Sequence, residues 1–499
     1  MALARNALFN LLGAAVPAVL GIITIPYVVR MLGTDGYGLL TLITAIVGYF
    51  AVLDVNLTAG STKYVAQFHA ARDHQSLAQT VSFGLAVYAG IGVVGACGLW
   101  VGSAWLVTDV FSVAPSQQTV AVDAVRVAAL GFFTGQVQAY LQSLPGALMR
   151  YDISGRTEAA FGAAVTLLTV LLLAMGWGLV EVVALRVGAS VLQALVLVLA
   201  LRRLLPVFKP AWPDRALRAQ LVGFSAFAFL SRLAALTYTH ADKLLIGHRV
   251  GTAAVAYYAV PSTLANRVMF LVFRLSGVMF PHASALAAQG RLDELREQYL
   301  LGSRFLFLLN GLIAVLLAML AQPLLTLWVG EEFARQGAAV LALVALAQWV
   351  DSLTNLPSMV NDGLGHPRVT GLSALARALV GLALVWVGVG WGGIQGAAWG
   401  HLVASVLMTI VFVVYVHGRT LPVALPTLLL QAYVRPLLVL LPVGALLWWW
   451  APKVAHWWTL VALGGTAVLL ALLLAWLWVL PVDMRQRLLK RGGSPSGRA

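Results

Sequence analysis

Residues 157–201 read TEAAFGAAVTLLTVLLLAMGWGLVEVVALRVGASVLQALVLVLAL. Two apolar runs stand on either side of the short break Gly176-Trp177-Gly178. Each run has about the 20 residues that an α-helix needs to cross the hydrocarbon core of a bilayer. The stretch therefore predicts a hairpin of two transmembrane helices.

The same pattern continues along the chain, which is 61% apolar and only 10% charged. Soluble domains carry roughly a quarter charged residues, so a chain of this composition would have no polar surface to show to water. The sequence predicts an all-α integral membrane protein of about fourteen transmembrane helices. They are expected near 7–29, 38–60, 80–106, 121–148, 157–176, 178–201, 219–239, 253–280, 298–320, 339–363, 369–389, 392–417, 431–451 and 457–480.

Basic residues in the predicted loops indicate the orientation of the chain. Loops on one side of the predicted membrane hold 19 Lys and Arg, and loops on the other side hold 5. The richer side is expected in the cytoplasm, which makes both termini cytoplasmic and the protein a multi-pass component of the cell's inner membrane. The net charge of +14 does not predict nucleic-acid binding, because the sequence has no basic face rich in aromatic residues.

Two pairs of segments resemble each other at similar spacing along the chain. Leu141-x-x-Leu144-Pro145 returns 212 residues later as Leu353-x-x-Leu356-Pro357, and the Arg-Met-Leu-Gly-Thr run at 30–34 returns as Arg-Val-Gly-Thr at 249–252. A parallel repeat of this kind predicts two six-helix lobes with the substrate path between them. The expected division is 1–201 for the first lobe, 202–218 for a basic cytoplasmic linker, 219–417 for the second lobe, 418–482 for a C-terminal helix pair and 483–499 for a basic cytoplasmic tail.

Charged residues inside the predicted spans are mostly arginines. An arginine at the centre of a transmembrane helix costs roughly 2.5–3.5 kcal/mol. The clear acids within the spans are Asp54, Glu181 and Asp351, too few to neutralise the set. The surplus predicts an interior that binds an anion, such as a pyrophosphate, through charge-assisted hydrogen bonds. For any single residue, a buried Arg–Asp pair that only holds the fold together stays an open alternative. The arginines within the predicted spans are Arg126, Arg186, Arg232, Arg267, Arg274, Arg304, Arg377 and Arg435.

Helical spacing places several polar residues on shared faces. Arg267 and Arg274 are seven apart and therefore lie on one face of their helix. Polar stripes are also expected at Gln348, Asp351, Asn355 and Asp362, at Arg186, Ser190 and Gln193, and at Gln138 and Gln142. Such stripes line cavities or helix–helix contacts. The candidate substrate-binding residues are Arg30, Asp54, Arg232, Arg267, Arg274, Arg304, Asp351, Asn355 and Arg377.

Motifs of nucleotide hydrolysis, zinc proteolysis and serine hydrolysis do not occur in the sequence. The single cysteine, Cys97, cannot form a disulfide within the chain. We therefore expect no catalytic residue, no cofactor and no metal site, and coupling to H⁺ or Na⁺ is left open.

The pattern Asn6 … Pro26-x-x-x-Arg30-x-x-Gly33-x-x-x-Tyr37-Gly38 resembles the opening of bacterial polysaccharide flippases of the MOP superfamily, the Wzx-like group. The segments 242–257 and 364–368 are similar to further parts of that family. The resemblance implies two lobes in a V, alternating access, and export of an undecaprenyl-pyrophosphate-linked oligosaccharide such as an O-antigen unit. It also implies contact with membrane lipid and association with a polysaccharide polymerase and glycosyltransferases.

Three other functions compete with this one. A multidrug or cation antiporter of the same superfamily would need an acidic lumen with few arginines. A flippase for the peptidoglycan precursor, lipid II, would share the cavity arginines, but the N-terminal signature favours the polysaccharide group. A membrane glycosyltransferase or ligase would need a large outer loop with carboxylates, and only Glu331 and Glu332 offer any.

Overall fold

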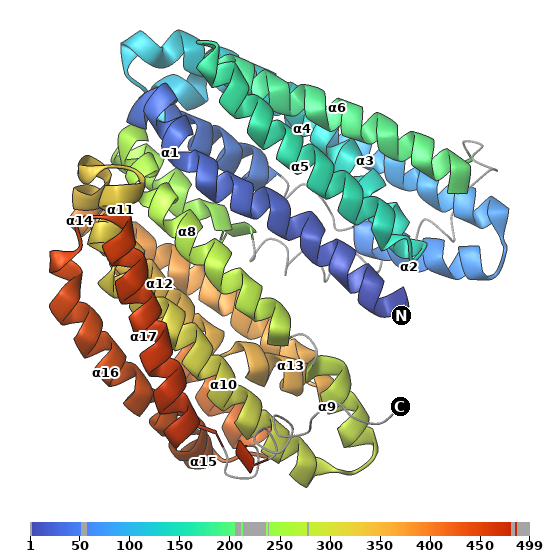
Figure 1. The fold of residues 1–499 in the computed structure, drawn as a ribbon. Helices are drawn as coiled ribbons and strands as arrows, with labels where there is room; N and C mark the ends of the chain where they lie inside the picture. The colour runs from blue at the N-terminus through green and yellow to red at the C-terminus, as the bar shows by residue number, and fades with distance from the viewer. Residues whose placement is uncertain are drawn as a thin grey trace, which may run out of the picture. The chain divides into compact units, whose positions relative to one another are not determined.

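The computed structural model describes residues 2–50, 57–204, 211–212, 236–237, 239–276, 279–480 and 485–486. Every regular element in these ranges is a helix (Figure 1). The predicted all-helical class is therefore confirmed for the described parts of the chain.

The chain divides into two compact units. The first contains Met1–Ala259 and Val389–Ile394, and the second contains the remaining residues. Two helices, α8 (Thr252–Ser276) and α14 (Pro367–Arg419), have residues in both units. Most of 202–235 lies outside the described residues, so the predicted limits of the lobes and of the linker stay predictions.

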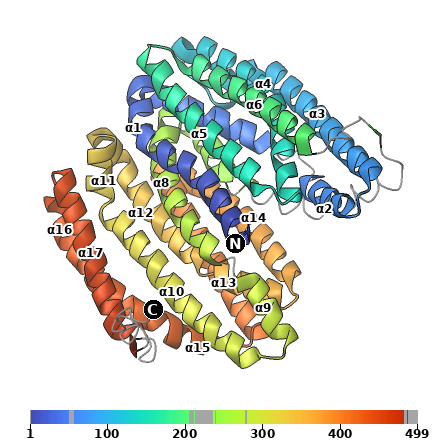
Figure 2. The ribbon, with the colours of Figure 1, turned by 45° about the vertical axis from the view of Figure 1, so that its right-hand side comes forward.

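The first unit is built on two helix layers that pack in pairs. The N-terminal helix α1 (Ala2–Phe50) packs along α5 (Tyr151–Ala174). Helix α4 (Gln118–Ala147) packs against both α3 (His74–Trp105) and α6 (Leu179–Leu204), as Figures 1 and 2 show. Helices α5 and α6 match the predicted spans 157–176 and 178–201 to within three residues at every end but one, since α5 begins six residues earlier, at Tyr151.

A short helix, α2 (Leu57–Ala70), closes one end of this unit against α3 and α4. Beneath it the rings of Tyr88 and Tyr140 stack with centroids 5.0 Å apart, and both side chains are almost fully buried. A Cβ on Gly84 would lie 2.1 Å from the ring of Tyr140, so the glycine lets α3 and α4 approach closely. At the start of α3, hydrogen bonds from Ser76 hold the pKa of the Asp73 carboxyl below its ordinary value.

The second unit consists mainly of helices from the C-terminal half. Helix α10 (Leu292–Met319) packs against α12 (Glu331–Ser352) and α16 (Val434–Trp450), and α16 packs against α17 (Trp457–Trp478). In this unit a π-helical turn, Leu429–Tyr433, precedes α16, and a 3₁₀ turn, Ala451–Lys453, follows it. In the first unit the π-helical turn Leu106–Val110 and the 3₁₀ turn Pro115–Gln117 lie between α3 and α4. The helices of this unit, beyond α8 and α14, are α9 (Met279–Ala288), α10 (Leu292–Met319), α11 (Ala321–Trp328), α12 (Glu331–Ser352), α13 (Asn355–Gly363), α15 (Leu425–Leu428), α16 (Val434–Trp450) and α17 (Trp457–Trp478).

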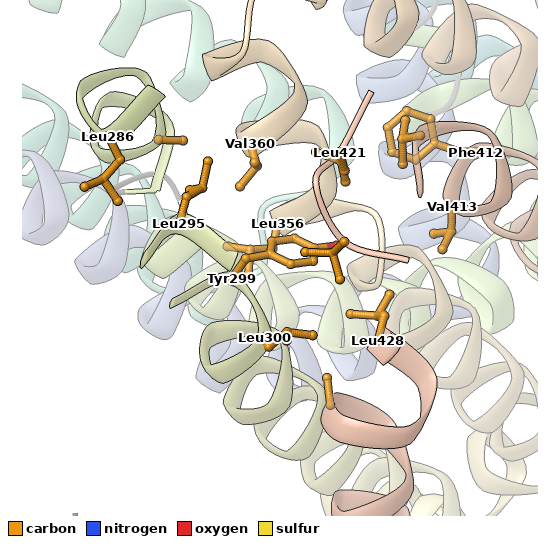
Figure 3. Packing of buried hydrophobic residues seen from close by; sticks show 14 residues of the cluster. Leu286, Leu295, Tyr299, Leu300, Leu356, Val360, Phe412, Val413, Leu421 and Leu428 are labelled. Atoms are coloured by element: carbon orange, nitrogen blue, oxygen red, sulfur yellow. The ribbon is translucent and has the colours of Figure 1, made fainter. Parts of the chain in front are cut away.

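A hydrophobic cluster joins α9, α10, α13 and the end of α14, with Tyr299 at its centre (Figure 3). The Tyr299 hydroxyl lies 2.9 Å from Nε2 of His417, and Nδ1 of His417 lies 2.7 Å from the carbonyl oxygen of Val423. A carbonyl only accepts hydrogen bonds, so Nδ1 carries the proton and Nε2 accepts from the tyrosine. This arrangement satisfies a neutral imidazole inside an apolar cluster.

Glycine kinks divide the two longest helices. Gly33 in α1 has φ 72°, and Gly393 in α14 has φ 55°, values that an L side chain rarely adopts. The Gly33 kink falls between the predicted spans 7–29 and 38–60, and Gly393 is the second residue of the predicted span 392–417, next to the predicted break after 389.

The two arms of α14 pack backbone against backbone beyond the kink. A Cβ on Gly388 would lie 2.1 Å from the carbonyl oxygen of Gly396, and one on Gly400 would lie 2.3 Å from that of Leu384. The paired residue numbers run in opposite directions, so the arms form an antiparallel hairpin.

Ten helices in the described ranges are long and apolar enough to cross a membrane, and α1 and α14 are two of them. The predicted span 219–239 lies mostly outside the described residues, so the number fourteen stays a prediction. The predicted span 339–363 is broken at Leu353 and Thr354, between α12 and α13. Pro357 has no N–H to donate to the carbonyl of Leu353, which weakens a continuous helix at this place.

We predict that Gly388→Ala destabilises the protein, because the added methyl group meets the backbone of Gly396 rather than a movable side chain. The expected loss is about 1–3 kcal/mol, the range for overpacking. The matched control is Gly371→Ala in the same helix, where a Cβ meets nothing within 4 Å. It should be neutral or stabilising by up to about 1 kcal/mol, the helix-propensity gain. Melting temperatures of the two purified variants check this, and equal melting temperatures would contradict the hairpin contact.

Candidate functional site

Arg377 and Asp351 form an ion pair between α14 and α12 in the second unit. Each side chain is only 14% exposed. Nη2 of Arg377 also donates to Oγ1 of Thr409 at 3.3 Å, and the Thr409 hydroxyl reaches the carbonyl oxygen of Val350 at 3.4 Å. The carboxylate neutralises the guanidinium, so this pair favours the structural alternative for two of the candidate residues.

Arg304 is held by main-chain oxygens. Its Nε donates to the carbonyl of Gln431 at 2.9 Å, and its Nη1 donates to the carbonyl of Val479 at 3.1 Å. Gln431 lies in the π-helical turn 429–433, and Val479 caps the end of α17. Carbonyls at a helix C-terminus have no intrahelical donor and carry partial negative charge, which suits a guanidinium. Arg304 therefore joins α10 to the C-terminal helices.

Two further candidate arginines have exposed side chains. Arg30 lies three residues before the Gly33 kink of α1, and Arg267 lies in α8. Within the described parts of the chain, neither forms an ion pair with an acid. Their assignment as substrate-binding residues stays a prediction.

The remaining candidates are described less fully. Asn355 is half-buried at the first residue of α13. Arg274 has its backbone in α8, but its side chain lies outside the described part. Asp54 and Arg232 lie outside the described residues altogether. Their assignment as substrate-binding residues stays a prediction.

The predicted polar stripes of α4 and α6 meet each other in the first unit. The hydroxyls of Thr134 and Ser190 lie 2.5 Å apart, and the side-chain amide of Gln193 donates to that of Gln142 at 3.4 Å. Gln142 also donates to the carbonyl of Ser154 at 2.8 Å on α5. These stripes therefore act, in the described residues, as helix–helix hydrogen bonds.

Asp362, the last member of the predicted stripe on 339–363, also bonds to protein. Its carboxylate accepts from the hydroxyl of Thr370 at 2.6 Å. The buried amide of Asn361 donates to the carbonyl of His366 and to Thr370, and it accepts from Thr420 at 2.7 Å. This network ties α13 to both ends of α14.

The two segments of the second sequence echo touch each other within the first unit. The hydroxyl of Thr252 donates to the carboxylate of Asp35, and a Cβ on Gly38 would lie 1.9 Å from the carbonyl oxygen of Thr252. Gly33 and Gly251, which match in the echo, both have positive φ, at 72° and 109°. The echo thus marks two equivalent helix turns, which accounts for its glycines.

Arg186 on α6 was not among the candidate substrate residues, yet its side chain is exposed in the structure. The sequence did place it in a predicted span and in a polar stripe. The missing information was the exposure of the face on which it lies.

Solved structures with the same arrangement of helices are transporters. An inward-facing multidrug resistance transporter of the MATE family, in the MOP superfamily, matches with a TM-score of 0.68 at 14% identity, over 84% of this chain and 98% of that one. A MOP superfamily transporter from Pyrococcus furiosus, described as having a binding pocket of reverse polarity, matches with a TM-score of 0.59 at 14% identity, over 84% and 95%. At this identity the likeness establishes the fold, which is that of the MOP transporters.

The chain belongs to the polysaccharide biosynthesis protein family, whose model matches residues 27–338, more than half of its length. It is 21% identical over 407 residues to the "Putative O-antigen transporter" of Shigella flexneri, covering 80% of this chain and 94% of that protein. It is 22% identical over 339 residues to the uncharacterized membrane protein EpsK of Bacillus subtilis, covering 66% of each chain. The resemblance seen in the sequence is confirmed, and the protein is a multi-pass membrane transporter of this family.

We predict that Arg377→Met and Asp351→Leu each destabilise the protein when made alone, by about 3–5 kcal/mol, because one buried charge loses its partner. The double variant should recover most of this loss, since both charges are then gone. Thermal unfolding of the three purified variants measures the coupling. Additive losses in the double variant would mean that the pair is not coupled.

Proposed function

We propose that this protein moves a lipid-linked oligosaccharide across the inner membrane by alternating access, with arginines binding its pyrophosphate or acidic sugars. The lipid carrier is undecaprenyl pyrophosphate, and the glycan is a unit of a surface polysaccharide. Family membership and the relative named as an O-antigen transporter support a polysaccharide substrate. The chain acts as a carrier and not as an enzyme.

The observation that carries the proposal is the difference between two groups of arginines that lie in or next to the predicted spans. Arg377 and Arg304 already have protein acceptors. Arg30, Arg186 and Arg267 have exposed side chains, and in the part of the chain that the structure describes no acid pairs with them. A guanidinium binds a phosphate or carboxylate through two parallel hydrogen bonds, so an anionic cargo would complement this second group.

A multidrug or cation antiporter would share the fold of the MATE structures, but exposed arginines inside the membrane repel a cationic cargo. The driving force is proposed to be an H⁺ or Na⁺ gradient, and a polymerase and glycosyltransferases are the proposed partners.

We expect the double substitution Arg267→Ala/Arg274→Ala to abolish surface polysaccharide in a bacterial strain that depends on this protein, with the protein still present at wild-type level. The substitutions remove two charges from one face of α8, where an anion would bind. Polysaccharide immunoblots and membrane protein levels are measured together.

The matched control is Arg126→Ala on α4. Arg126 is also exposed, but it lies beside Asp123, with 3.9 Å between the charged atoms, and against the ring of Trp100. The Arg126→Ala variant should export polysaccharide normally. Normal polysaccharide in the α8 double variant would overturn its role in binding.

The orientation is tested separately with reporter fusions. A fusion within 202–218 should report the cytoplasm and one near Glu331 the periplasm, because the basic loops stay inside. The reverse pattern would place the termini outside.

A further inference from the structure

Helix α6 has one buried face and one exposed face. The buried face carries Leu179, Val182, Val183, Leu197 and Leu201, whereas Leu192, Leu195 and Leu199 on the other side are 55%, 55% and 60% exposed. Arg186 follows Leu179 by seven residues, Val182 by four and Val183 by three, so it lies on the buried face. Its side chain is nevertheless exposed. The Arg186 side chain is therefore exposed on the side of α6 that faces neighbouring helices, opposite the side that carries Leu192, Leu195 and Leu199.

Thr44 on α1 is likewise an exposed residue among buried neighbours. Its side chain is exposed, although Leu42, Ile43, Ala45 and Ile46 around it are at most 6% exposed. The two exposed side chains touch, because Nη1 of Arg186 donates to Oγ1 of Thr44 at 3.2 Å. The Thr44 hydroxyl in turn donates to the carbonyl of Leu40 at 2.7 Å, which leaves its oxygen free to accept. The threonine thus holds the guanidinium in one direction.

The pair lies well inside the helices. Arg186 is seven residues into α6, which corresponds to about 10 Å at 1.5 Å per residue, and Thr44 is eleven residues past the Gly33 kink, about 16 Å. The predicted orientation places the start of α6 and the Gly33 kink on the periplasmic side of the membrane. A charge at such depth is costly unless it is paired or hydrated.

Within the described ranges, most of the bonding capacity of Arg186 is unused. A guanidinium has five N–H donors, and among the described residues Thr44 is the acceptor found for it. None of the ion pairs in the described ranges includes Arg186. Its other close titratable neighbour is the phenol of Tyr37 on α1, which can donate but does not bring a negative charge at neutral pH. An anion is the group that would complete this site.

We propose that Arg186, positioned by Thr44, binds a phosphate oxyanion within the first unit and forms a station for the pyrophosphate of the transported lipid. The inference rests on the proposed function and names a residue pair for it. Phosphate oxygens match the fork of a guanidinium, as carboxylate oxygens do, and a pyrophosphate brings more acceptor oxygens and more negative charge than a carboxylate.

The test is binding of farnesyl pyrophosphate, a short soluble lipid pyrophosphate, to the purified full-length protein. Arg186→Gln keeps much of the side-chain volume without the charge and should weaken binding about tenfold or more, the loss expected for charge-assisted hydrogen bonds. Arg186→Lys keeps the charge but lacks the planar guanidinium, so its affinity should lie between those of the wild type and Arg186→Gln. Arg126→Gln is the matched control and should bind as the wild type does. Unchanged binding by a folded Arg186→Gln variant overturns the proposal.

Thr44 has its own pair of variants. Thr44→Val has the same shape but no hydroxyl and should weaken binding, whereas Thr44→Ser should restore it. A purely structural role for Thr44 would not separate these two at equal melting temperature. Equal binding by valine and serine variants therefore overturns the positioning role.

A membrane phospholipid could supply the same phosphate chemistry, so phosphatidylglycerol vesicles are the competing probe. Weak competition by these vesicles supports the lipid-pyrophosphate assignment, and equal competition that is lost in Arg186→Gln overturns it.

Failure of the inference is also distinct from failure of the proposed function. If the wild type binds and exports and Arg186→Gln does both equally well, only the Arg186 site is wrong. If a strain without this protein keeps its polysaccharide, the proposed function is wrong.

Discussion

Each arginine inside the membrane needs acceptors for its five N–H groups, and lipid offers none. The helices of this protein meet that requirement in three ways. Asp351 and Thr409 surround Arg377, the carbonyls of Gln431 and Val479 hold Arg304, and Thr44 holds one edge of Arg186. Arg377 and Arg304 each have at least two protein acceptors. For the third, the side chain of Arg186 stays exposed, and Thr44 is the acceptor found for it among the described residues.

Main-chain carbonyls make the second solution possible. A regular helix uses its carbonyls internally, so free ones occur at helix ends and at local breaks in the pattern. Arg304 takes one carbonyl from each source, the π-helical turn before α16 and the end of α17. The C-terminal helix pair is thereby attached to α10 by polar contacts in addition to the apolar cluster around Val439 and Val443.

Close approach of backbones is the other main source of cohesion. Because lipid tails are as apolar as the helices, burial alone gives little drive for helix association, and small residues at contacts become important. Gly388 and Gly396 bring the arms of α14 together, Gly38 brings α1 onto Thr252, and Gly84 admits the ring of Tyr140. These contacts occur where the sequence shows glycine in otherwise apolar helices.

The sequence by itself determined the all-helical membrane class, the family and the places where α1 and α14 turn. These depend on composition, on the length of apolar runs and on glycines, all of which are local properties of the chain. It also indicated that arginines outnumber acids within the spans. Pro357 was the only sign in the sequence of the break between α12 and α13. The number of spans and the limits of the lobes depend partly on residues outside the described ranges.

Only the tertiary structure decided which arginines are already satisfied. Asp351 and Arg377 are 26 residues apart, and Arg304 and Val479 are 175 apart, so no helical spacing could reveal these contacts. The same holds for Arg186, whose partner Thr44 lies 142 residues earlier. A side chain's acceptors and its exposure are set by helices that are distant in sequence, and for that reason the fold class can be predicted from the sequence more fully than the site.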